Sequence, residues 1–436
     1  MTIEPDALKD AASGVLAPLD DDLGRLVDCY VDLHRHPELS LQEVRTAGIV
    51  ADRLTKSGYE VTTGVGGTGV VGVLRNGDGP IVALRADMDA LPVREETGLP
   101  YASEVVTKDE QGRDVGVMHA CGHDAHVTCM IGAADLMARA RDAWRGTLIW
   151  LGQPAEETIA GAELMLRDDL YARFGTPDVV LGQHVGPLPT GCVYHRPGAI
   201  MASTMSLDVT IHGRGGHGSK PENAIDPVVI GAYIITRLQT IVAREIDPMD
   251  PAVVTVGEFH AGTKSNVIPA QAHLAINIRS YDDRVQRHLV EAIGRIVRAE
   301  AEAGRCPQPP DITRSYGGPV TNNDADVITR VQSAHRAWFG SERVIDLPKP
   351  VMGSEDFGLF ARPDGNADSP STIPTGFWFW GGAGQDQLAA APGESLAAKV
   401  ANLPSNHHPA FQVDPEPTLR TGVEALGVAA LAYLAG

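Results

Sequence analysis

The sequence predicts an α/β protein with a large, mostly parallel sheet and a smaller α+β domain inserted into it. Three apolar runs indicate the large sheet: IVAL (81–84), TLIWL (147–151) and DVVLG (178–182). Runs without polar alternation are typical of parallel strands that are covered on both faces. In contrast, MSLDVTIHGRGG (205–216) and AHLAINIRS (272–280) alternate at period two, which predicts an antiparallel sheet with one exposed face.

The chain of 436 residues is long enough for two domains. The alternating pattern begins at about residue 198, and CPQPPDITRSYGGPV (306–320) is predicted to be the linker that returns to the larger domain. We therefore predict one domain formed by residues 1–197 and 313–436. Residues 198–312 should form the inserted domain, an antiparallel sheet with two helices.

The other elements follow from local patterns. Residues 20–58 look helical, with Ser40 and Glu43 in the spacing of a capping box. Residues 59–93 alternate short apolar runs with turn residues, which predicts strands and a hairpin. A helix should follow residue 126, because apolar residues recur there at helical spacing. Further helices are expected at 226–245, 282–304 and from 419 to the C-terminus, and a further strand at 377–382.

One glycine-rich segment could be either a dinucleotide-binding fingerprint or a turn. Residues 64–69 match the GxGxxG fingerprint of dinucleotide-binding proteins. That fingerprint requires a helix to begin at the glycines, whereas VVGVL continues as a β-branched strand. We therefore predict a turn and no dinucleotide cofactor.

Composition limits the partners. The net charge of −20 disfavours nucleic acids and anionic membranes. No run of about 18 apolar residues is present, and the acidic start of the chain is unlike a secretory signal. The five cysteines are odd in number and scattered, which indicates thiols rather than a disulfide framework. We expect a cytoplasmic protein.

Polar side chains follow each of the three apolar runs. Asp87 and Asp89 come after the first, Glu156 and Glu157 after the second, and His184 after the third. The carboxyl ends of parallel strands meet at one edge of the sheet, where ligands bind. Two further segments, HACGHDAH and SNHHPAF, add more potential metal ligands: Cys121, His123, His407 and His408.

This mixture of ligands favours a catalytic metal site. A structural zinc site would show several cysteines in paired CxxC spacing, and the chain has none. If Glu157 binds metal, its neighbour Glu156 can serve as the general base for water. Two alternatives remain: the glutamates could form a solvated helix N-terminus, and Cys121 at a helix N-terminus could be a nucleophile.

The motifs resemble those of a known family. LHRHPELS, LRADMDALPV, MHACGHDAHV, QPAEE, GRGGHGS, NVIP and GSEDF stand in the order seen in metal-dependent amidohydrolases of the peptidase M20 group. The resemblance is to the branch of hippurate hydrolases, aminoacylases and auxin–amino-acid hydrolases, and it covers nearly the whole chain. It implies a two-metal catalytic domain interrupted by a lid domain that dimerises, with the following ligands in this chain: Cys121, His123, Glu157, His184 and His407.

The resemblance also implies roles for other residues. Glu156 becomes the general base, and His217 resembles the histidine that reaches a neighbouring subunit's site to stabilise the oxyanion. Asn266 and Arg279 match residues that hold the substrate's carboxylate. His408 stays an alternative to His407, and Glu355 is expected to line the site. Three carboxylates should orient ligand imidazoles: Asp87, Asp89 and Asp124.

The implied activity is hydrolysis of an N-acyl amino acid to a carboxylic acid and a free amino acid. Two divalent metal ions are expected per subunit, either zinc, manganese, cobalt or nickel. We expect a homodimer or a tetramer that binds a small molecule, and no nucleic acid or membrane partner. The alternatives are a dipeptidase or aminopeptidase on the same machinery, and a metal-binding protein without turnover.

Overall fold

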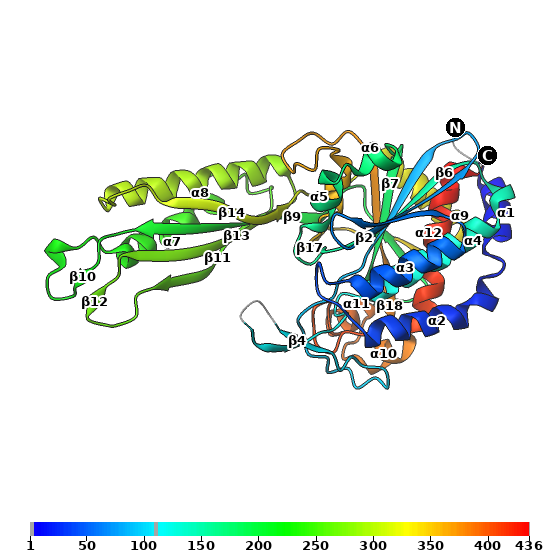
Figure 1. The fold of residues 1–436 in the computed structure, drawn as a ribbon, viewed down its shortest axis with the longest axis horizontal. Coiled ribbons are helices and arrows are strands. Elements are labelled where there is room, and N and C mark those ends of the chain that lie inside the picture. Colours follow the sequence, from blue (N-terminus) through cyan, green and yellow to red (C-terminus); the bar gives the residue numbers. More distant parts are fainter. Residues whose placement is uncertain (1–3, 109–111, 436) are drawn as a thin grey trace. The chain divides into compact units, whose positions relative to one another are not determined.

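The computed structural model describes residues 4–108 and 112–435, and it divides into two compact units (Figure 1). Unit 1 comprises Met1–Ile200, Asn322–Lys349 and Asp356–Gly436. Unit 2 comprises Met201–Thr321 and Pro350–Glu355. An insertion of an α+β unit into an α/β unit is the arrangement that the sequence predicts.

Unit 1 is built on an eight-stranded sheet in the order β1-β2-β6-β3-β7-β18-β8-β16. Its centre consists of four parallel strands, β6, β3, β7 and β18. At one edge β2 and β1 are added by antiparallel pairing, and at the other β8 pairs antiparallel with β18 and parallel with β16. The strands are β1 (Glu60–Val65), β2 (Gly69–Asn76), β3 (Ile81–Asp87), β6 (Gly146–Gln153), β7 (Val179–Pro189), β8 (Val193–His195), β16 (Val344–Asp346) and β18 (Thr375–Ala383). Separately, β4 (Val106–Lys108) pairs antiparallel with β5 (Asp114–Gly116).

The central strands are buried along most of their length, because helices cover the sheet. From Val82 to Asp87 every residue of β3 is buried, as the continuous apolar run predicts. One continuous apolar core joins residues of these strands to helices α2, α3, α4 and α12. The helices of unit 1 are α1 (Pro5–Leu16), α2 (Leu19–Arg35), α3 (Val44–Lys56), α4 (His123–Arg139), α5 (Gly161–Arg167), α6 (Leu170–Phe174), α9 (Ala325–Phe339), α10 (Gln385–Ala390), α11 (Leu396–Ala401) and α12 (Pro415–Leu434).

Unit 2 is an antiparallel sheet in the order β11-β13-β9-β14, packed against helices α7 and α8. Buried and half-buried residues alternate along β13, which confirms the pattern seen in its sequence. Asp226 and Asp282 cap the two helices through their side chains. The elements are β9 (Gly198–His212), β10 (Gly216–His217), α7 (Pro227–Arg244), β11 (Ala252–Ala261), β12 (Val267–Ile268), β13 (Gln271–Ser280), α8 (Asp283–Ala303), β14 (Asp311–Gly318) and β17 (Val351–Ser354). The short strand β15 (Thr321–Asn323) begins at the last residue of this stretch of unit 2 and continues into unit 1.

Two local predictions were wrong. The return to unit 1 comes at about residue 321 and not at 312, because residues 311–318 form β14 and pair with β9 instead of forming a linker. The chain also re-enters unit 2 briefly at Pro350–Glu355. The capping box at residues 40–43 does not form: α3 begins at Val44, and the Ser40 hydroxyl donates to Asp89 Oδ2 at 2.7 Å.

The glycine-rich stretch 64–69 is a turn, as predicted. It joins β1 to β2 in an antiparallel hairpin, and Gly66 and Gly67 have positive φ angles of 65° and 112°. No helix begins there, so the dinucleotide fingerprint has no structural support. Among the described residues, no helix is long and apolar enough to cross a membrane.

Candidate metal centre

The carboxyl-terminal ends of three neighbouring strands, β6, β3 and β7, position candidate ligands of unit 1. Asp87 is the last residue of β3, and β6 ends at Gln153, directly before the segment that carries Glu156 and Glu157. The third strand, β7, continues five residues past His184, but its pairing with β3 stops at Gly182. His184 follows Gly182 by two residues and is therefore level with Asp87, the last residue of β3, at the same edge of the sheet.

The fourth segment is the turn that enters α4. Gly122 is the N-cap of this helix and has a φ angle of 84°, in the left-handed region that favours glycine. A Cβ atom at this position would lie 2.4 Å from Val185 Cγ1. Glycine thus lets the turn approach the strand that carries His184, so that Cys121 and His123 face this strand.

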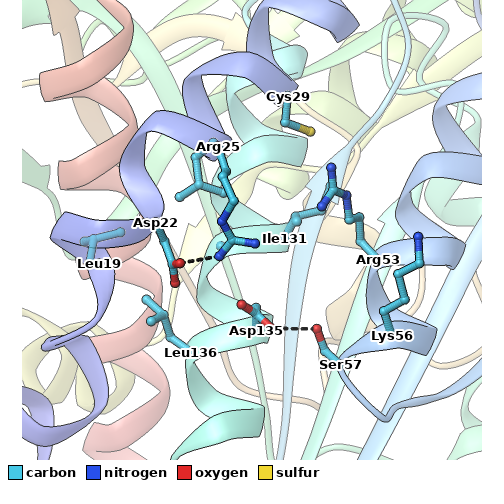
Figure 2. Close-up of a pocket in the computed structure, with 12 residues that line it drawn as sticks. Leu19, Asp22, Arg25, Cys29, Arg53, Lys56, Ser57, Ile131, Asp135 and Leu136 are labelled. Carbon is cyan, nitrogen blue, oxygen red and sulfur yellow. Dashed lines mark hydrogen bonds and ion pairs between the residues drawn. The ribbon is translucent and has the colours of Figure 1, made fainter.

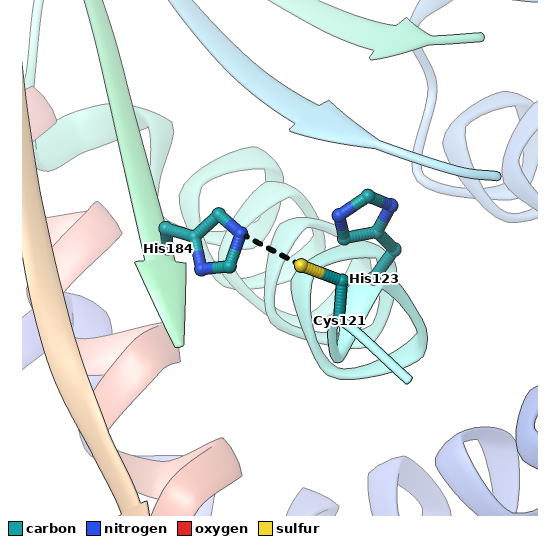
Figure 3. A group of neighbouring side chains, drawn as sticks. All are labelled: Cys121, His123 and His184. Carbon is teal, nitrogen blue, oxygen red and sulfur yellow. Dashed lines mark hydrogen bonds between the residues drawn. The ribbon is translucent and has the colours of Figure 1, made fainter. Parts of the chain in front are cut away.

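Cys121 lies between two imidazoles (Figure 3). Its Sγ atom is 3.4 Å from His184 Nε2, and His123 stands on the other side. Sγ is also 3.2 Å from Nε2 of His407, which comes from the far C-terminal part of the chain. The thiol can therefore contact ions on two sides, as a bridging ligand does.

Glu157 joins the same cluster. Its Oε2 atom is 3.3 Å from His407 Nε2, and its Oε1 atom is 3.8 Å from His123 Nε2. His408 is an exposed residue whose Nδ1 atom accepts the backbone N–H of Ala410 at 3.0 Å. Of the two adjacent histidines, the structure thus brings His407 into the cluster.

Two imidazoles present the nitrogen that a metal requires. His123 donates its Nδ1–H to the backbone carbonyl of Asp89 at 2.8 Å, and His184 donates its Nδ1–H to the carbonyl of Val185 at 2.7 Å. In the neutral form, both rings then have the lone pair at Nε2. These are the two Nε2 atoms that face the cluster.

Unsatisfied atoms mark the centre of the cluster. Within residues 4–108 and 112–435, His123 Nε2 and Glu157 Oε1 are buried without a hydrogen-bond partner. Buried polar atoms without partners are rare and costly. A divalent cation would satisfy both atoms, so the donor set fits a metal. Three of the groups of side chains that could hold an ion are Cys121, His123 and His184; Cys121, Glu157 and His407; and His123, Glu156 and Glu157.

The electrostatics of the cluster also favour a cation. Burial raises the pKa of Glu157 to about 8, and the negative charges of Asp89 and Asp87 add to this effect. Burial and the neighbouring glutamates hold the pKa of the Cys121 thiol well above its usual value. A thiol in this environment is a poor nucleophile, whereas a bound metal ion would stabilise its thiolate. The arrangement thus favours a ligand role over a nucleophilic one.

Asp87 and Asp89 support the cluster from β3 and the loop after it. Asp89 Oδ2 accepts the backbone N–H of Glu157 at 3.0 Å, and Asp89 Oδ1 lies 3.3 Å from His123 Nδ1. Asp87 contacts His126 and accepts a hydrogen bond from Arg85 at 2.6 Å. Its Oδ2 atom is 3.5 Å from His123 Nε2. Asp89 is therefore placed to orient His123 from its Nδ1 side, whereas Asp87 holds His126 and lies near the metal-facing nitrogen of His123.

Asp124 differs from its predicted role. Its carboxylate accepts hydrogen bonds from His34 Nδ1 at 2.6 Å and from the backbone N–H of Ala125, and it does not hydrogen-bond a ligand imidazole. His34 also contacts Glu95 at 3.1 Å. Burial alone would lower the pKa of His34, but the two carboxylates raise it to about 9. Asp124 thus anchors α4 to α2 through a charged histidine.

One positioning residue, Asn406, is absent from the sequence-based set. Its side-chain amide donates to the backbone carbonyls of Cys121 at 3.1 Å and Val185 at 3.2 Å, and it lies 3.8 Å from Cys121 Sγ. The next residue, His407, has a φ angle of 70°, which is unusual for a histidine. Asn406 therefore ties this strained loop to two ligand-bearing segments. The only sequence signal was its place beside His407.

The candidate residues of unit 2 fall into two groups. His217 pairs with Val267 in the short β10–β12 ladder, and the Gly218 N–H donates to the carbonyl of Asn266 at 2.9 Å. His217 and Asn266 are therefore neighbours, and both are exposed. Nδ1 of His217 accepts the backbone N–H of Ser219 at 3.1 Å, so the neutral ring carries its hydrogen at Nε2.

Arg279 lies at the other end of unit 2. It stands near the end of β13, and its Nη1 donates to the carbonyl of Met352 at 2.7 Å and to Ser354 at 3.1 Å, both on β17 (Figure 1). Asn266 comes before Gln271, the first residue of β13, whereas Arg279 is the ninth residue of that strand. The distance along the strand from Gln271 to Arg279 is about 26 Å, at 3.3 Å per residue. Arg279 and Asn266 of one chain therefore cannot bind the same small carboxylate. Glu355 is fully buried at the end of the segment Pro350–Glu355.

Comparison with known proteins identifies the family. The model of peptidase family M20/M25/M40 matches residues 83–405. The chain belongs to this family. Among its relatives, the hippurate hydrolase of Campylobacter jejuni is 39% identical over 332 residues, which are 76% of this chain and 83% of that protein. The N-acetylcysteine deacetylase of Bacillus subtilis is 34% identical and covers 90% of this chain and 92% of its own length.

A solved structure of the M20 family has the same fold. The dinuclear metal-binding peptidase of the M20 family from Bacillus subtilis superposes with a TM-score of 0.71 at 29% identity, over 94% of this chain and 99% of that chain. Members of the M20/M25/M40 family named as hydrolases, carboxypeptidases and deacetylases act on amide bonds, and this chain is a hydrolase of the same kind. Its ligand cluster is a divalent-metal site.

Proposed function

We propose that this hydrolase cleaves N-acyl amino acids to a carboxylic acid and a free amino acid. The names of its relatives support this substrate class, since they include a hippurate hydrolase, an N-acetylcysteine deacetylase and an IAA–amino acid hydrolase. The structural observation that carries the proposal is Glu156. This buried carboxylate lies beside the metal-ligand cluster, with Oε2 3.9 Å from His123 Nε2.

The ligands of the proposed centre are Cys121, His123, Glu157, His184 and His407, which would hold two divalent ions. Cys121 would hold a central place among these ligands, because its sulfur lies within 3.4 Å of both His184 and His407. Thiolate and imidazole favour zinc, cobalt or nickel, and the carboxylates also suit manganese. Bound there, such ions act as Lewis acids that polarise the substrate carbonyl and lower the pKa of water.

Glu156 is the proposed general base. Its carboxylate takes the proton of the attacking water and returns it to the nitrogen of the leaving amine. Burial of Glu156 excludes competing solvent and strengthens these interactions. Glu157 would bind metal through its carboxylate, and its backbone N–H donates to Asp89 Oδ2, which holds this residue at the cluster. The two adjacent glutamates would thus have separate roles.

The residues of unit 2 are proposed to act on the substrate. His217 would donate its Nε2–H to the oxyanion of the transition state, since Ser219 occupies its Nδ1 atom. Arg279 and Asn266 would bind the substrate's carboxylate. Because they lie at opposite ends of unit 2, we propose that His217 and Asn266 serve a neighbouring subunit of a homodimer. The scattered free thiols suit a cytoplasmic location.

A carboxypeptidase is the second candidate. It is favoured by a relative named thermostable carboxypeptidase 1 from Saccharolobus solfataricus, which is 37% identical and covers 76% of this chain. Such an enzyme would also recognise a free terminal carboxylate, but its substrate would carry an amino acid where the other substrate carries an acyl group.

A substrate panel separates the two candidates. N-acetyl and N-benzoyl amino acids, dipeptides and the amide of each are incubated with the metal-loaded enzyme, and the released amino acid is quantified. The proposal predicts the highest kcat/KM for an N-acyl amino acid. Amidation of its carboxylate should lower kcat/KM about 10- to 150-fold, the value of one charge-assisted hydrogen bond. Preference for dipeptides would favour the carboxypeptidase instead.

A further inference from the structure

A cavity lies in unit 1 between helices α2, α3 and α4 (Figure 2). Its volume is about 170 Å³. Four buried apolar side chains, each no more than 8% exposed, form part of its wall: Leu19, Leu26, Ile131 and Leu136. A dry cavity of roughly 150 Å³ can hold a benzene ring. The cavity is therefore large enough for an apolar body the size of one aromatic ring.

The cavity also has a cationic rim, formed by Arg25, Arg53 and Lys56. Figure 2 shows the Arg25 and Arg53 side chains on opposite sides of Ile131. Lys56 pairs with Asp52, and Arg25 pairs with Asp22. The Arg53 side chain makes no ion pair or hydrogen bond within the part of the chain that the structure describes.

Two carboxylates line the cavity, but the surrounding cations compensate them. Arg139 binds Asp22 and also Asp135, and Ser57 donates to Asp135 at 2.9 Å. Counting the lining residues together with their partners Arg139 and Asp52, four cations face three carboxylates. One positive charge is thus left without a partner, in a protein whose net charge is −20.

This cavity is separate from the metal centre. Gly132 lines it, and Gly132 lies nine residues beyond His123 on α4, or about 13 Å along the helix axis. None of the proposed metal ligands lines it.

We propose that this cavity binds a small monocarboxylate with an apolar body, such as an aryl or short acyl carboxylate. The apolar wall would bury the ring or chain, and the carboxylate would face Arg53 at the rim. Inorganic phosphate has the charge but gains nothing from the apolar wall. The acid product of the proposed reaction belongs to the predicted ligand class, but the proposal itself rests on the cavity alone.

The test uses 4-fluorobenzoate as the probe and ¹⁹F NMR of the metal-loaded enzyme as the readout. Binding in this cavity should have a Kd on the order of 1 mM, as expected for a ligand of this size. Arg53→Glu should weaken it at least about fivefold, because an attractive charge becomes a repulsive one. Arg75→Glu is the control: Arg75 is exposed on β2, pairs with Glu60 and does not line the cavity. It changes the net charge equally and should leave binding unchanged.

A second variant tests the apolar part. Ile131→Phe places a ring inside the cavity and should abolish this binding, while retained catalytic activity shows that the variant is folded. Neutral 4-fluorobenzamide should bind at least about fivefold more weakly than the acid, and phosphate should not compete at equal concentration. The proposal is overturned if Arg53→Glu binds like the control, if Ile131→Phe binds like the unmodified enzyme, or if phosphate competes as well as benzoate.

Discussion

The candidate residues of the two units are arranged in opposite ways. In unit 1, segments that are up to 286 residues apart converge on Cys121 in a largely buried cluster with unsatisfied atoms, and of the proposed ligands only His407 is exposed. In unit 2, His217 and Asn266 are exposed at one end, and Arg279 lies at the other. A buried, convergent cluster can bind metal within one unit. Exposed and separated residues need a second surface before they can act on one substrate.

Metal removal should show the largest effect and should act on unit 1. Exhaustive dialysis against EDTA is expected to abolish amide hydrolysis, and added zinc or manganese should restore it. Hydrogen exchange should rise at residues 119–126, 153–157 and 404–411, because the metal joins these segments. Residues 201–321 should keep their exchange rates. Full turnover after complete metal removal would contradict the account.

Subunit mixing tests whether the exposed residues of unit 2 serve a neighbouring subunit. His217→Ala and Glu156→Gln are each expected to be inactive. After full exchange at equal amounts, half of the dimers are mixed, and each mixed dimer has one intact site if His217 acts in trans. About a quarter of the unmodified activity should return. Differently tagged subunits confirm the exchange, and no recovery after confirmed exchange would show that His217 does not act in trans.

Acid should destabilise unit 1 through a buried histidine pair. His195 Nε2 contacts His335 Nδ1 at 2.9 Å, and both side chains are fully buried. Burial lowers the pKa of His335 to about 4 from an ordinary 6.5. The unfolded chain therefore binds more protons between pH 6.5 and about 4, so stability is lost as the pH falls through this window.

For His335, this loss is about 3 kcal/mol, since one pKa unit corresponds to about 1.4 kcal/mol. Urea unfolding of the native protein and of His335→Gln, measured from pH 7 to 4, gives the two pH slopes. The variant should lose less stability across this range, whatever its stability at pH 7. Equal slopes would show that His335 is not the titrating group.

Of the changes considered, substitution of Asn406 should have the smallest effect on the metal centre. Asn406→Ala removes the amide that holds Cys121 and Val185, and it should weaken metal binding about 10- to 100-fold in a chelator competition. Asn402→Ala is a matched control from the same region, because the Asn402 amide binds the carbonyls of Pro392 and Ala398 instead. Equal metal affinities of the two variants would show that Asn406 does not position the ligands.

The convergent cluster could be predicted from the sequence because strand direction determines which residues meet. Three apolar runs followed by polar side chains place Asp87, Glu157 and His184 at one edge, provided that the strands are parallel. The continuous burial of β3 and the alternation along β13 are local properties of the sequence, so the two sheet types were also predictable.

Other features depend on contacts that no local pattern contains. Residues 311–318 look like a linker, but the neighbouring edge of β9 turns them into a strand. Ser40 fits a helix cap by spacing, yet its hydroxyl binds Asp89, 49 residues away. Asp124 binds His34 on another helix. Such long-range partners compete with local preferences, and only the folded structure shows which of them prevails.

The most direct test of the account compares two adjacent glutamates in the purified enzyme. Glu156→Gln and Glu157→Gln are assayed for bound metal by elemental analysis and for turnover of an N-acyl amino acid. Glu156→Gln is expected to keep its metal while kcat falls about 10²- to 10⁴-fold, because the variant lacks the general base. Glu157→Gln should lose metal, because Glu157 is a ligand. Metal loss in Glu156→Gln together with full metal content in Glu157→Gln would contradict the assignment and exchange the two roles.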